Sequence, residues 1–521
     1  MASPPEKQET TERLSAPAPS ELERGGATPN SDEFILAKDG TVLVPQPSSS
    51  PDDPLNWSWA KKHIVLCALI PGCLLSDWAL TWGSVLFQLQ APEWHMSVTA
   101  VSQSMSPGIF MQGPGGILAV PLCQRYGRLP VLFWSQLLSL IVTIGATFAD
   151  SYASFTAMRT LQGFFGAAPQ VIGLSIIHDM FFFHERARKI NIWAASFLIG
   201  PYLGPFFSSL LVTKLNWRQD FGVLAGFYGL SLLMVVLLGD ETLYDRNVVA
   251  EKPKNKSILR HLSLLFGIEG ARVGGRPGLW TVTKHQYSLL ARPYLFAPSC
   301  NPLTATSAAL FVMPLTMWTI GLVSTISQFV LPPPPPMGPG YGFTYVSLAM
   351  IHFAPMIGTL LAEFWGHWFN DFIATRYIKR HGGTHMAENR LNGVYIPVII
   401  GVGGLVLFGE TLQHHLTWVG LAFGWGMTCF ATLGGMTAIS AYVLDCFPHH
   451  AAPASAWINF WRVIGGFTVT YFQMDWVSLN GPAVTFGCQA AIIAGATAAV
   501  TVTQVWGERW RAKWPAPAAE N

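Results

Sequence analysis

Ionisable side chains that interrupt long apolar runs are the residues of this 521-residue chain whose types could do chemistry. They are Asp77, Arg159, Glu363, Asp445 and Arg462. A charge near the middle of a bilayer costs about 2.5–3.5 kcal/mol on insertion scales, so such residues usually face a cavity or a partner. An acid there could take up a proton or pair with a cationic substrate. It could equally form a structural pair with an arginine or a hydroxyl.

The run Arg159–Ala168 combines an interior charge with small residues. Gly163 and Gly166 would give a face on which another helix can pack closely. Arg159 would then present a permanent positive charge to the interior, where it could lower the pKa of a neighbouring carboxyl group. Together with Gln162, it is a candidate for coupling proton binding to substrate movement.

A second helix-packing motif is Gly200-Pro201-Tyr202-Leu203-Gly204-Pro205. Gly200 and Gly204, four residues apart, would form a close-approach face, and Pro201 and Pro205 would bend the helix. A bent, closely packed helix could act as a hinge or as a seal against leakage. Simple packing explains the same pattern equally well.

The elements that must position these residues are apolar stretches long enough to span a bilayer, about 20 residues each. We predict twelve transmembrane helices, near 63–84, 98–122, 129–149, 152–178, 190–213, 219–239, 302–330, 343–365, 391–410, 415–445, 455–475 and 482–506. Five consecutive prolines at 332–336 fall between two of these spans and predict a local polyproline II segment.

The distribution of Lys and Arg predicts the orientation. With the N-terminus inside, the inner segments that flank the spans hold 23 of the 31 Lys and Arg, and the outer loops hold two. The positive-inside rule therefore places both termini in the cytosol. We expect a disordered tail, a first six-helix half, a central cytosolic loop, a second half and a C-terminal tail at 1–60, 61–239, 240–301, 302–506 and 507–521.

Composition excludes several other classes of protein. Only 12% of the residues are charged, against about 25% in soluble domains, and 50% are hydrophobic. The net charge of +2 argues against a nucleic-acid partner. The seven cysteines mostly lie within apolar runs, and the paired histidines lack helical ligand spacing, so we expect no metal site. No nucleophile–base motif or nucleotide-binding loop stands out, so we expect neither an enzyme nor a cofactor.

These features resemble the major facilitator superfamily, in particular its fungal twelve-span drug:proton antiporter-like group. Arg159–Ala168 is similar to the motif of that family's fourth span, and Gly200–Pro205 resembles the motif of the fifth span associated with exporters. The run Asp53-Pro54-Leu55-Asn56-Trp57 and the run Glu241-Thr242-Leu243 resemble the family's lead-in and its ending after span six. The segments 366–371 and 442–445 are also similar to that group.

The loop between spans two and three departs from the family pattern G-x-x-x-D-R-x-G-R-R. Arg125, Gly127 and Arg128 match, but Gln124 occupies the position of the family's aspartate. That aspartate helps to close the inner gate through charge pairing, so a gate built in that way is not expected here. Arg125 and Arg128 could instead interact with helix ends, or simply satisfy the positive-inside rule.

The resemblance implies a monomeric plasma-membrane transporter with two pseudo-repeated halves that rock around a central site. It would export a small amphipathic molecule, such as a drug, toxin or secondary metabolite, coupled to proton entry. The first alternative is an importer of the same fold for a nutrient or organic cation, which Asp77 would suit. A polytopic membrane enzyme and a sensor that transports nothing are further alternatives. The partners expected are the substrate, protons and lipid.

Overall fold

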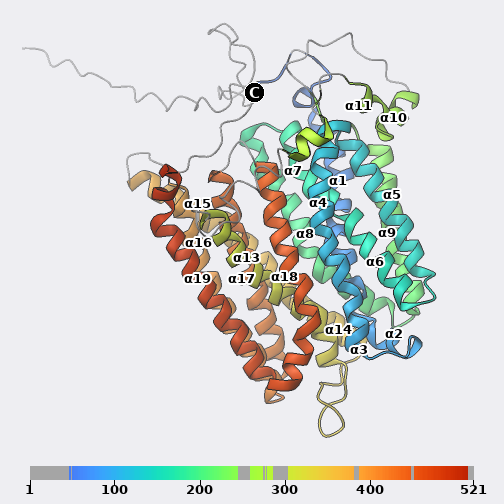
Figure 1. Ribbon diagram of the computed structural model, residues 1–521, viewed down its shortest axis with the longest axis vertical. Coiled ribbons are helices and arrows are strands. Elements are labelled where there is room, and N and C mark those ends of the chain that lie inside the picture. Colours follow the sequence, from blue (N-terminus) through green and yellow to red (C-terminus); the bar gives the residue numbers. More distant parts are fainter. Residues whose placement is uncertain are drawn as a thin grey trace, which may run out of the picture.

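The computed structural model describes residues 46–48, 50–244, 258–273, 276, 278–284, 303–380, 386–446 and 451–513. These residues form helices and no strands. The molecule consists of two helical bundles that lie side by side, one blue to green and one yellow to red in Figure 1. The expected N-terminal tail up to residue 45, and most of the expected central loop, lie outside the described residues.

The first bundle contains the helices that come from the first half of the chain. Side-chain caps fix where several of them begin: Ser58 accepts from the amide of Lys61, and Asn216 forms a reciprocal capping box with Gln219. The helices are α1 (Trp59–Trp82), α2 (Phe87–Glu93), α3 (Val98–Ser102), α4 (Ser106–Tyr126), α5 (Arg128–Thr147), α6 (Tyr152–Gly166), α7 (Ala168–Met180), α8 (Phe183–Leu211) and α9 (Trp217–Leu238).

Two short helices, α10 (Ile258–Leu265) and α11 (Ile268–Arg272), lie at one end of this bundle, which we call the α10–α11 end. The second bundle contains α13 (Leu303–Val330), α14 (Tyr345–Ile351), α15 (Phe353–Arg380), α16 (Asn392–Gln413), α17 (Trp418–Cys446), α18 (Ala451–Asn480) and α19 (Pro482–Lys513). The opposite end of the molecule carries α2, α3 and α14, and we call it the α2–α3 end (Figure 1).

Each of the twelve predicted spans coincides with a long helix or with two consecutive helices. Nine segments of the described residues are long and apolar enough to cross a membrane. The predicted boundaries need correction where proline restarts a helix. The span expected from residue 98 becomes continuous only at Ser106, where Pro107 occupies the first turn of α4. Pro169 likewise begins α7 and divides the expected span 152–178.

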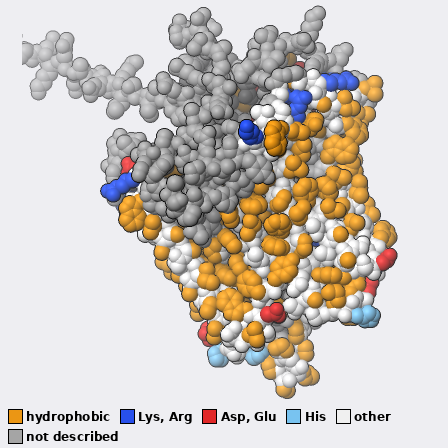
Figure 2. Space-filling model, in the orientation of Figure 1, with side chains coloured by type: hydrophobic (Ala, Val, Ile, Leu, Met, Phe, Trp, Pro, Cys, Tyr) orange, Lys and Arg blue, Asp and Glu red, His pale blue; other side chains and the backbone are white. Residues whose placement is uncertain are grey.

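The outer surface of the described helices is largely apolar, as expected for contact with lipid acyl chains. Figure 2 shows hydrophobic side chains over the middle of the molecule, with Lys and Arg at the α10–α11 end of this face. Large exposed apolar residues come from many helices, among them Ile141, Leu233, Ile357, Leu361 and Phe423. The chain is a multi-pass membrane protein.

The prediction of a stiff polyproline II segment at 332–336 is wrong. This loop folds back on itself: the amides of Met337, Gly340 and Gly342 donate to the carbonyls of Pro334, Pro333 and Pro332. Such short-range hydrogen bonds do not exist in polyproline II. The glycines after the prolines supply the donors that proline lacks, and Gly342 adopts a φ of 66°, a backbone conformation that favours glycine.

The two bundles contact each other near the α2–α3 end. Ser327 at the end of α13 donates to the carbonyl of Ser84, just after α1, at 2.8 Å. The hydroxyls of Ser106 in α4 and Thr470 in α18 are hydrogen-bonded. The rings of Phe206 in α8 and Phe353 in α15 pack with centroids 5.2 Å apart. These contacts hold the bundles together on this side.

Candidate functional site

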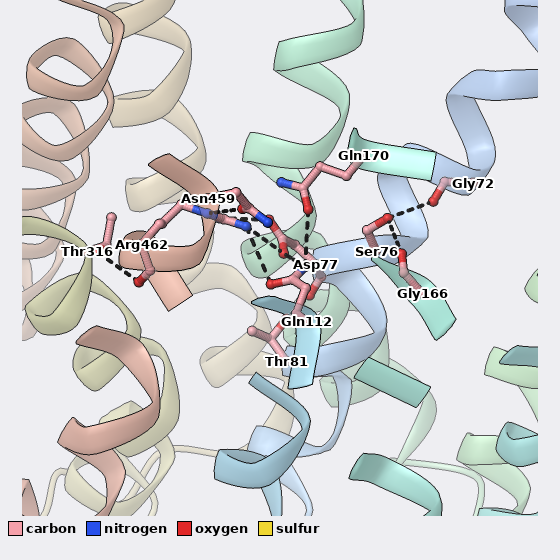
Figure 3. A network of polar contacts seen from close by, with 10 residues as sticks. All are labelled: Gly72, Ser76, Asp77, Thr81, Gln112, Gly166, Gln170, Thr316, Asn459 and Arg462. Carbon is pink, nitrogen blue, oxygen red and sulfur yellow. Dashed lines mark hydrogen bonds and ion pairs between the residues drawn. The ribbon is translucent and has the colours of Figure 1, made fainter. Parts of the chain in front are cut away.

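A buried ion pair joins the two bundles in the interior of the molecule. Asp77 of α1 binds both terminal nitrogens of Arg462 of α18: Oδ2 lies 3.0 Å from Nη1, and Oδ1 lies 3.2 Å from Nη2 (Figure 3). The side chains are only 4% and 10% exposed. Two of the predicted site residues, 385 positions apart in the chain, therefore form one bidentate contact.

Neutral amides complete the coordination of both charges (Figure 3). Gln112 of α4 donates through Nε2 to Asp77 Oδ1 at 2.6 Å and to Gln170 Oε1 of α7 at 3.2 Å. Its Oε1 accepts from Arg462 Nη2 at 3.5 Å, while Arg462 Nε donates to Asn459 Oδ1 at 3.0 Å. Each charged group thus has several hydrogen-bond partners, which a buried ion pair needs to offset its loss of water.

Helix α8 packs directly on the segment of α1 that carries Asp77. A Cβ at Gly200 would lie 3.5 Å from Cβ of Asp77 and 2.9 Å from the carbonyl oxygen of Leu74. A Cβ at Gly204 would stand 2.5 Å from the carbonyl oxygen of Trp78. Gly200 and Gly204 thus face α1 at close range, and α1 is the helix that carries Asp77. Pro201 and Pro205 both lie inside α8, which continues to Leu211.

Arg159 lies apart from this ion pair and binds neutral groups. It is 2% exposed, and it donates from Nη1 to the carbonyl of Ala79 at 2.6 Å and from Nη2 to the carbonyl of Leu80. It also donates to Gln162, whose Nε2 donates to Thr143 of α5 at 2.6 Å. Arg159 thereby ties α6 to the backbone of α1. None of these partners is the carboxylate that the sequence suggested.

The small residues beside Arg159 allow close packing, as predicted. A Cβ at Gly163 would overlap the carbonyl oxygen of Gly108 in α4. Gly166 is less tightly packed: its nearest neighbour would be the Tyr228 hydroxyl at 3.5 Å. The Gly166 carbonyl accepts from Ser76 at 2.7 Å, one residue before Asp77. The motif therefore holds α6 against both α4 and α1.

Arg125, Gly127 and Arg128 lie at the α10–α11 end, outside the central site. Arg128 Nε pairs with Asp179 at the end of α7 at 3.0 Å. The carboxylate of Glu241 caps the start of α5 by accepting from the amides of Arg128 and Leu129 at 2.9 and 3.2 Å. Arg128 therefore pairs with an acid of its own bundle.

Two residues of this loop have further fixed contacts. Gly127 has a φ of 116°, and a Cβ there would overlap the carboxylate of Glu241, so both the backbone and the space favour glycine. Arg125 donates to the carbonyls of Ala271, within α11, and of Val273, just beyond it, at 3.4 and 3.5 Å. Arg125 therefore interacts with a helix end, one of the two roles predicted for it.

The last two predicted residues, Glu363 and Asp445, lie on helices of the second bundle. Glu363 is half-buried in α15. Asp445 lies in α17, and its side chain is outside the part that the structure describes. Within the described ranges, no group of three or more His, Cys, Asp or Glu side chains could hold a metal ion.

Sequence reasoning missed the amides of the cluster and one buried acid. Gln112 and Gln170 are 1% and 5% exposed within apolar helices, and an amide in such a place was a usable signal. Asp220, near the start of α9, is fully buried and accepts from Ser208 at 2.7 Å. It is the second residue of the span predicted at 219–239, a position at which an acid is expected to lie at the membrane surface.

The sequence of this chain is similar to a known protein family and to individual members of it. The profile of the Major Facilitator Superfamily matches residues 68–470. The chain is 23% identical to efflux pump radE of Floropilus chiversii, over 87% of this chain and 81% of the relative. It is 22% identical to citrate exporter 1 of Aspergillus niger, over 92% and 93%.

A solved structure has the same arrangement of helices. It is a bacterial homologue of the human lysosomal transporter Spinster, with a TM-score of 0.57 and 14% identity, and the match covers 88% of this chain and 100% of that one. Its fold agrees with the two bundles, and the stretch matched by the family profile includes both Asp77 and Arg462. The chain is a member of the major facilitator superfamily.

Proposed function

We propose that this transporter is a secondary active exporter of a small organic molecule, that it works by alternating access, and that its movement is coupled to protons. The observation that carries the proposal is the Asp77–Arg462 ion pair, because it connects α1 of one bundle with α18 of the other. A contact between two bodies that rock against each other must change during transport. The relatives named as an efflux pump and a citrate exporter support export.

The chemistry of the pair supplies the coupling. Asp77 is a carboxylate that can take up a proton, whereas a guanidinium stays charged in proteins. Protonation of Asp77 removes the attraction that holds Arg462 and frees the bundles to move relative to each other. A proton and a substrate that both act on this contact would bias the same two-state equilibrium, as coupled transport requires.

Contacts between the bundles lie at the α2–α3 end and also on the α10–α11 side of the ion pair, where Val120 and Val171 of the first bundle form a buried cluster with Ala456 of α18. Ser84 with Ser327, Ser106 with Thr470, and the Phe206–Phe353 ring pair join the bundles at the α2–α3 end. We place the α10–α11 end in the cytosol, since 23 of the 31 Lys and Arg flank spans on that side and two lie on the other. An exporter must separate the bundles on the cytosolic side to load its substrate, and at the α2–α3 end to release it.

The test uses yeast cells that produce the chain at the plasma membrane and are preloaded with labelled citrate or a labelled amphipathic drug. Export predicts faster loss of at least one label than from cells with empty vector. Accumulation of the label instead would support the alternative, an importer of the same fold. No flux of any label in either direction would contradict the proposal.

The role of the ion pair is tested in the same cells. Asp77→Asn keeps the shape of the side chain but removes its charge, so we expect the response of flux to external pH to be lost. Asp475→Asn makes the same change at an exposed position of α18 and should leave both flux and its pH response unaltered. A normal pH response in Asp77→Asn would remove Asp77 from the coupling mechanism.

A further inference from the structure

The Asp77–Arg462 pair has a chemical asymmetry that bears on the charge of the substrate. This inference rests on the proposed function. The pair is buried, bidentate and bridged by Gln112, so a charged substrate that reaches it must displace one of the two partners. A cation would replace Arg462 at the carboxylate. An anion would replace Asp77 at the guanidinium.

The two replacements leave different groups behind. A cationic substrate would leave Arg462 charged and unpaired beside it, because a guanidinium cannot lose its proton in a protein. An uncompensated buried charge is strongly unfavourable. An anionic substrate would leave Asp77, which can take up one proton and become neutral. Only the second replacement ends without an unpaired charge.

The surroundings of Asp77 do not reverse this preference. The charged groups that the described elements bring to this part of α1 are two positive ones, Arg462 and Arg159, and one acid, Asp220 of α9, which interacts with Trp82. Arg159 remains bound to backbone carbonyls. The titratable hydroxyls nearby are Tyr202 of α8, which interacts electrostatically with Asp77, and Tyr228 of α9, which lies 3.5 Å from the carbonyl of Leu75. The balance of formal charge therefore favours an incoming anion.

Gln112 can form a hydrogen bond with Asp77 whether that carboxyl group is charged or protonated. Its Nε2 now donates to Asp77 Oδ1, and its Oε1 lies 3.5 Å from Arg462 Nη2. An amide offers both donors and an acceptor, so the same side chain could accept a hydrogen bond from a protonated Asp77. Gln170, the second amide partner of Gln112, is well placed to hold that side chain in either state.

We propose that the substrate is an organic anion whose acidic group binds Arg462, and that Asp77 takes up one proton in the same step. In the empty carrier Asp77 occupies the place of the substrate's acidic group. The proton then accompanies the substrate, unlike in an exchange of one for the other. For an exported dianion one net negative charge leaves the cell, and an inside-negative potential of 100 mV favours that movement about 50-fold.

Binding to the purified full-length chain tests the proposal. Isothermal titration calorimetry would use citrate and benzoate as anions and tetraphenylphosphonium as a cation, at about pH 5.5 and about pH 7.5, in two buffers that differ in ionisation enthalpy. We expect at least one anion to bind, with uptake of about one proton. Its affinity should fall by up to about tenfold for each unit by which the pH rises. Absence of binding by both anions would overturn the proposal.

Two single variants and one double variant separate the roles of Asp77 and Arg462. Asp77→Asn mimics the protonated acid, so it should bind the anion with little pH dependence and about as tightly as the natural chain does at the lower pH. Arg462→Gln should weaken anion binding at least about tenfold. Since that variant leaves Asp77 buried without its partner, the double variant Asp77→Asn with Arg462→Gln keeps the interior neutral and should also lose the anion.

Other outcomes would contradict the proposal while leaving the proposed function intact. Tetraphenylphosphonium that binds more tightly as the pH rises, and that needs Asp77 but not Arg462, would show a cation site. Loss of anion binding in Asp77→Asn at both pH values would show that the charged carboxylate itself is required. Flux in cells reports export independently of these results, so failure of the anion assignment and failure of export can be told apart.

Discussion

The two arginines inside the bundles bind different kinds of partner. Arg462 pairs with a carboxylate of the other bundle, whereas Arg159 donates to two carbonyls near the end of α1 and to Gln162. The first contact can be broken by a proton, and the second cannot. Arg462 therefore takes part in a contact that protonation of its partner can break. The contacts of Arg159 have no partner of that kind.

Replacement of Arg159 tests the fixed contact. Arg159→Ala should abolish transport while the protein still reaches the membrane. It should also lower the free energy of unfolding by about 1.5–3 kcal/mol, because hydrogen bonds from a charged donor to α1 are lost. Arg159→Lys restores the charge but not the fork of donors, and should recover only part of the flux. Flux assays and thermal unfolding of the purified variants measure both effects, and full activity in Arg159→Ala would assign the motif to packing alone.

The sequence predicts which residues are unusual better than it predicts contacts between residues far apart in the chain. An acid and an arginine inside apolar spans are visible in sequence, because their insertion cost makes them exceptional. That Asp77 pairs with Arg462 and not with Arg159 was not visible, since 385 residues separate the partners and only the packing of the two bundles against each other decides it. The bridging amide of Gln112 escaped attention because an uncharged side chain costs less to bury than a charged one.

At the scale of elements, glycines set the distance between helices in the first bundle. Gly163 of α6 lies against the carbonyl of Gly108 in α4, and Gly204 of α8 against the carbonyl of Trp78 in α1. By contrast, Gly226 and Gly229 of α9 have open space where a Cβ would lie. Only some glycines of the chain therefore allow helices to pack closely. Their spacing in the sequence did not distinguish them from glycines that face open space.

A matched pair of substitutions tests this difference. Gly163→Ala should destabilise the protein by about 2 kcal/mol or more, because the new methyl group forces α6 away from α4. Gly229→Ala should be neutral or slightly stabilising, because it restricts the unfolded chain and meets nothing in the folded one. The shift in the midpoint of thermal unfolding measures both, and equal effects of the two changes would contradict close packing at Gly163.

The ends of α5 and α7 form a second contact that can be tested at this scale. Asp179→Asn removes the partner of Arg128, whose side chain is 12% exposed, and should cost about 1–3 kcal/mol. Asp240→Asn breaks an ion pair with Lys61 in which both side chains are about a third exposed, so we expect a much smaller change. Unfolding midpoints at low salt compare the two, and a larger effect of Asp240→Asn would show that this end is held differently.

For the whole molecule, the arrangement of helices was more predictable than their contacts. Length and hydropathy placed all twelve predicted spans on observed helices, because a bilayer demands long apolar segments with internally satisfied backbones. The same signals carry no information on which surfaces of the two bundles meet. The pairing of Ser84 with Ser327 and of Phe206 with Phe353 depends on how the bundles are tilted against each other.

Alternating access predicts that the bundles must separate at the α2–α3 end. A cysteine pair at Ser106 and Thr470, whose hydroxyls touch across the bundles, should stop transport when it is crosslinked, and a reductant should restore it. The control is a cysteine pair at Thr319 and Thr432, whose hydroxyls lie 2.6 Å apart within the second bundle. Crosslinking there should leave most of the flux, and unchanged flux in the first crosslinked pair would argue against separation at this end.

The ion pair between α1 and α18 also has a consequence for how the protein is made. Asp77 leaves the ribosome 385 residues before Arg462, and at about 5–20 residues per second this interval lasts tens of seconds. During that time the first bundle lies in the membrane, and Asp77 has Gln112 as a partner but not Arg462. A fragment that ends before α18 never gains this counter-charge. We therefore expect such a fragment to be less stable in the membrane than the complete chain.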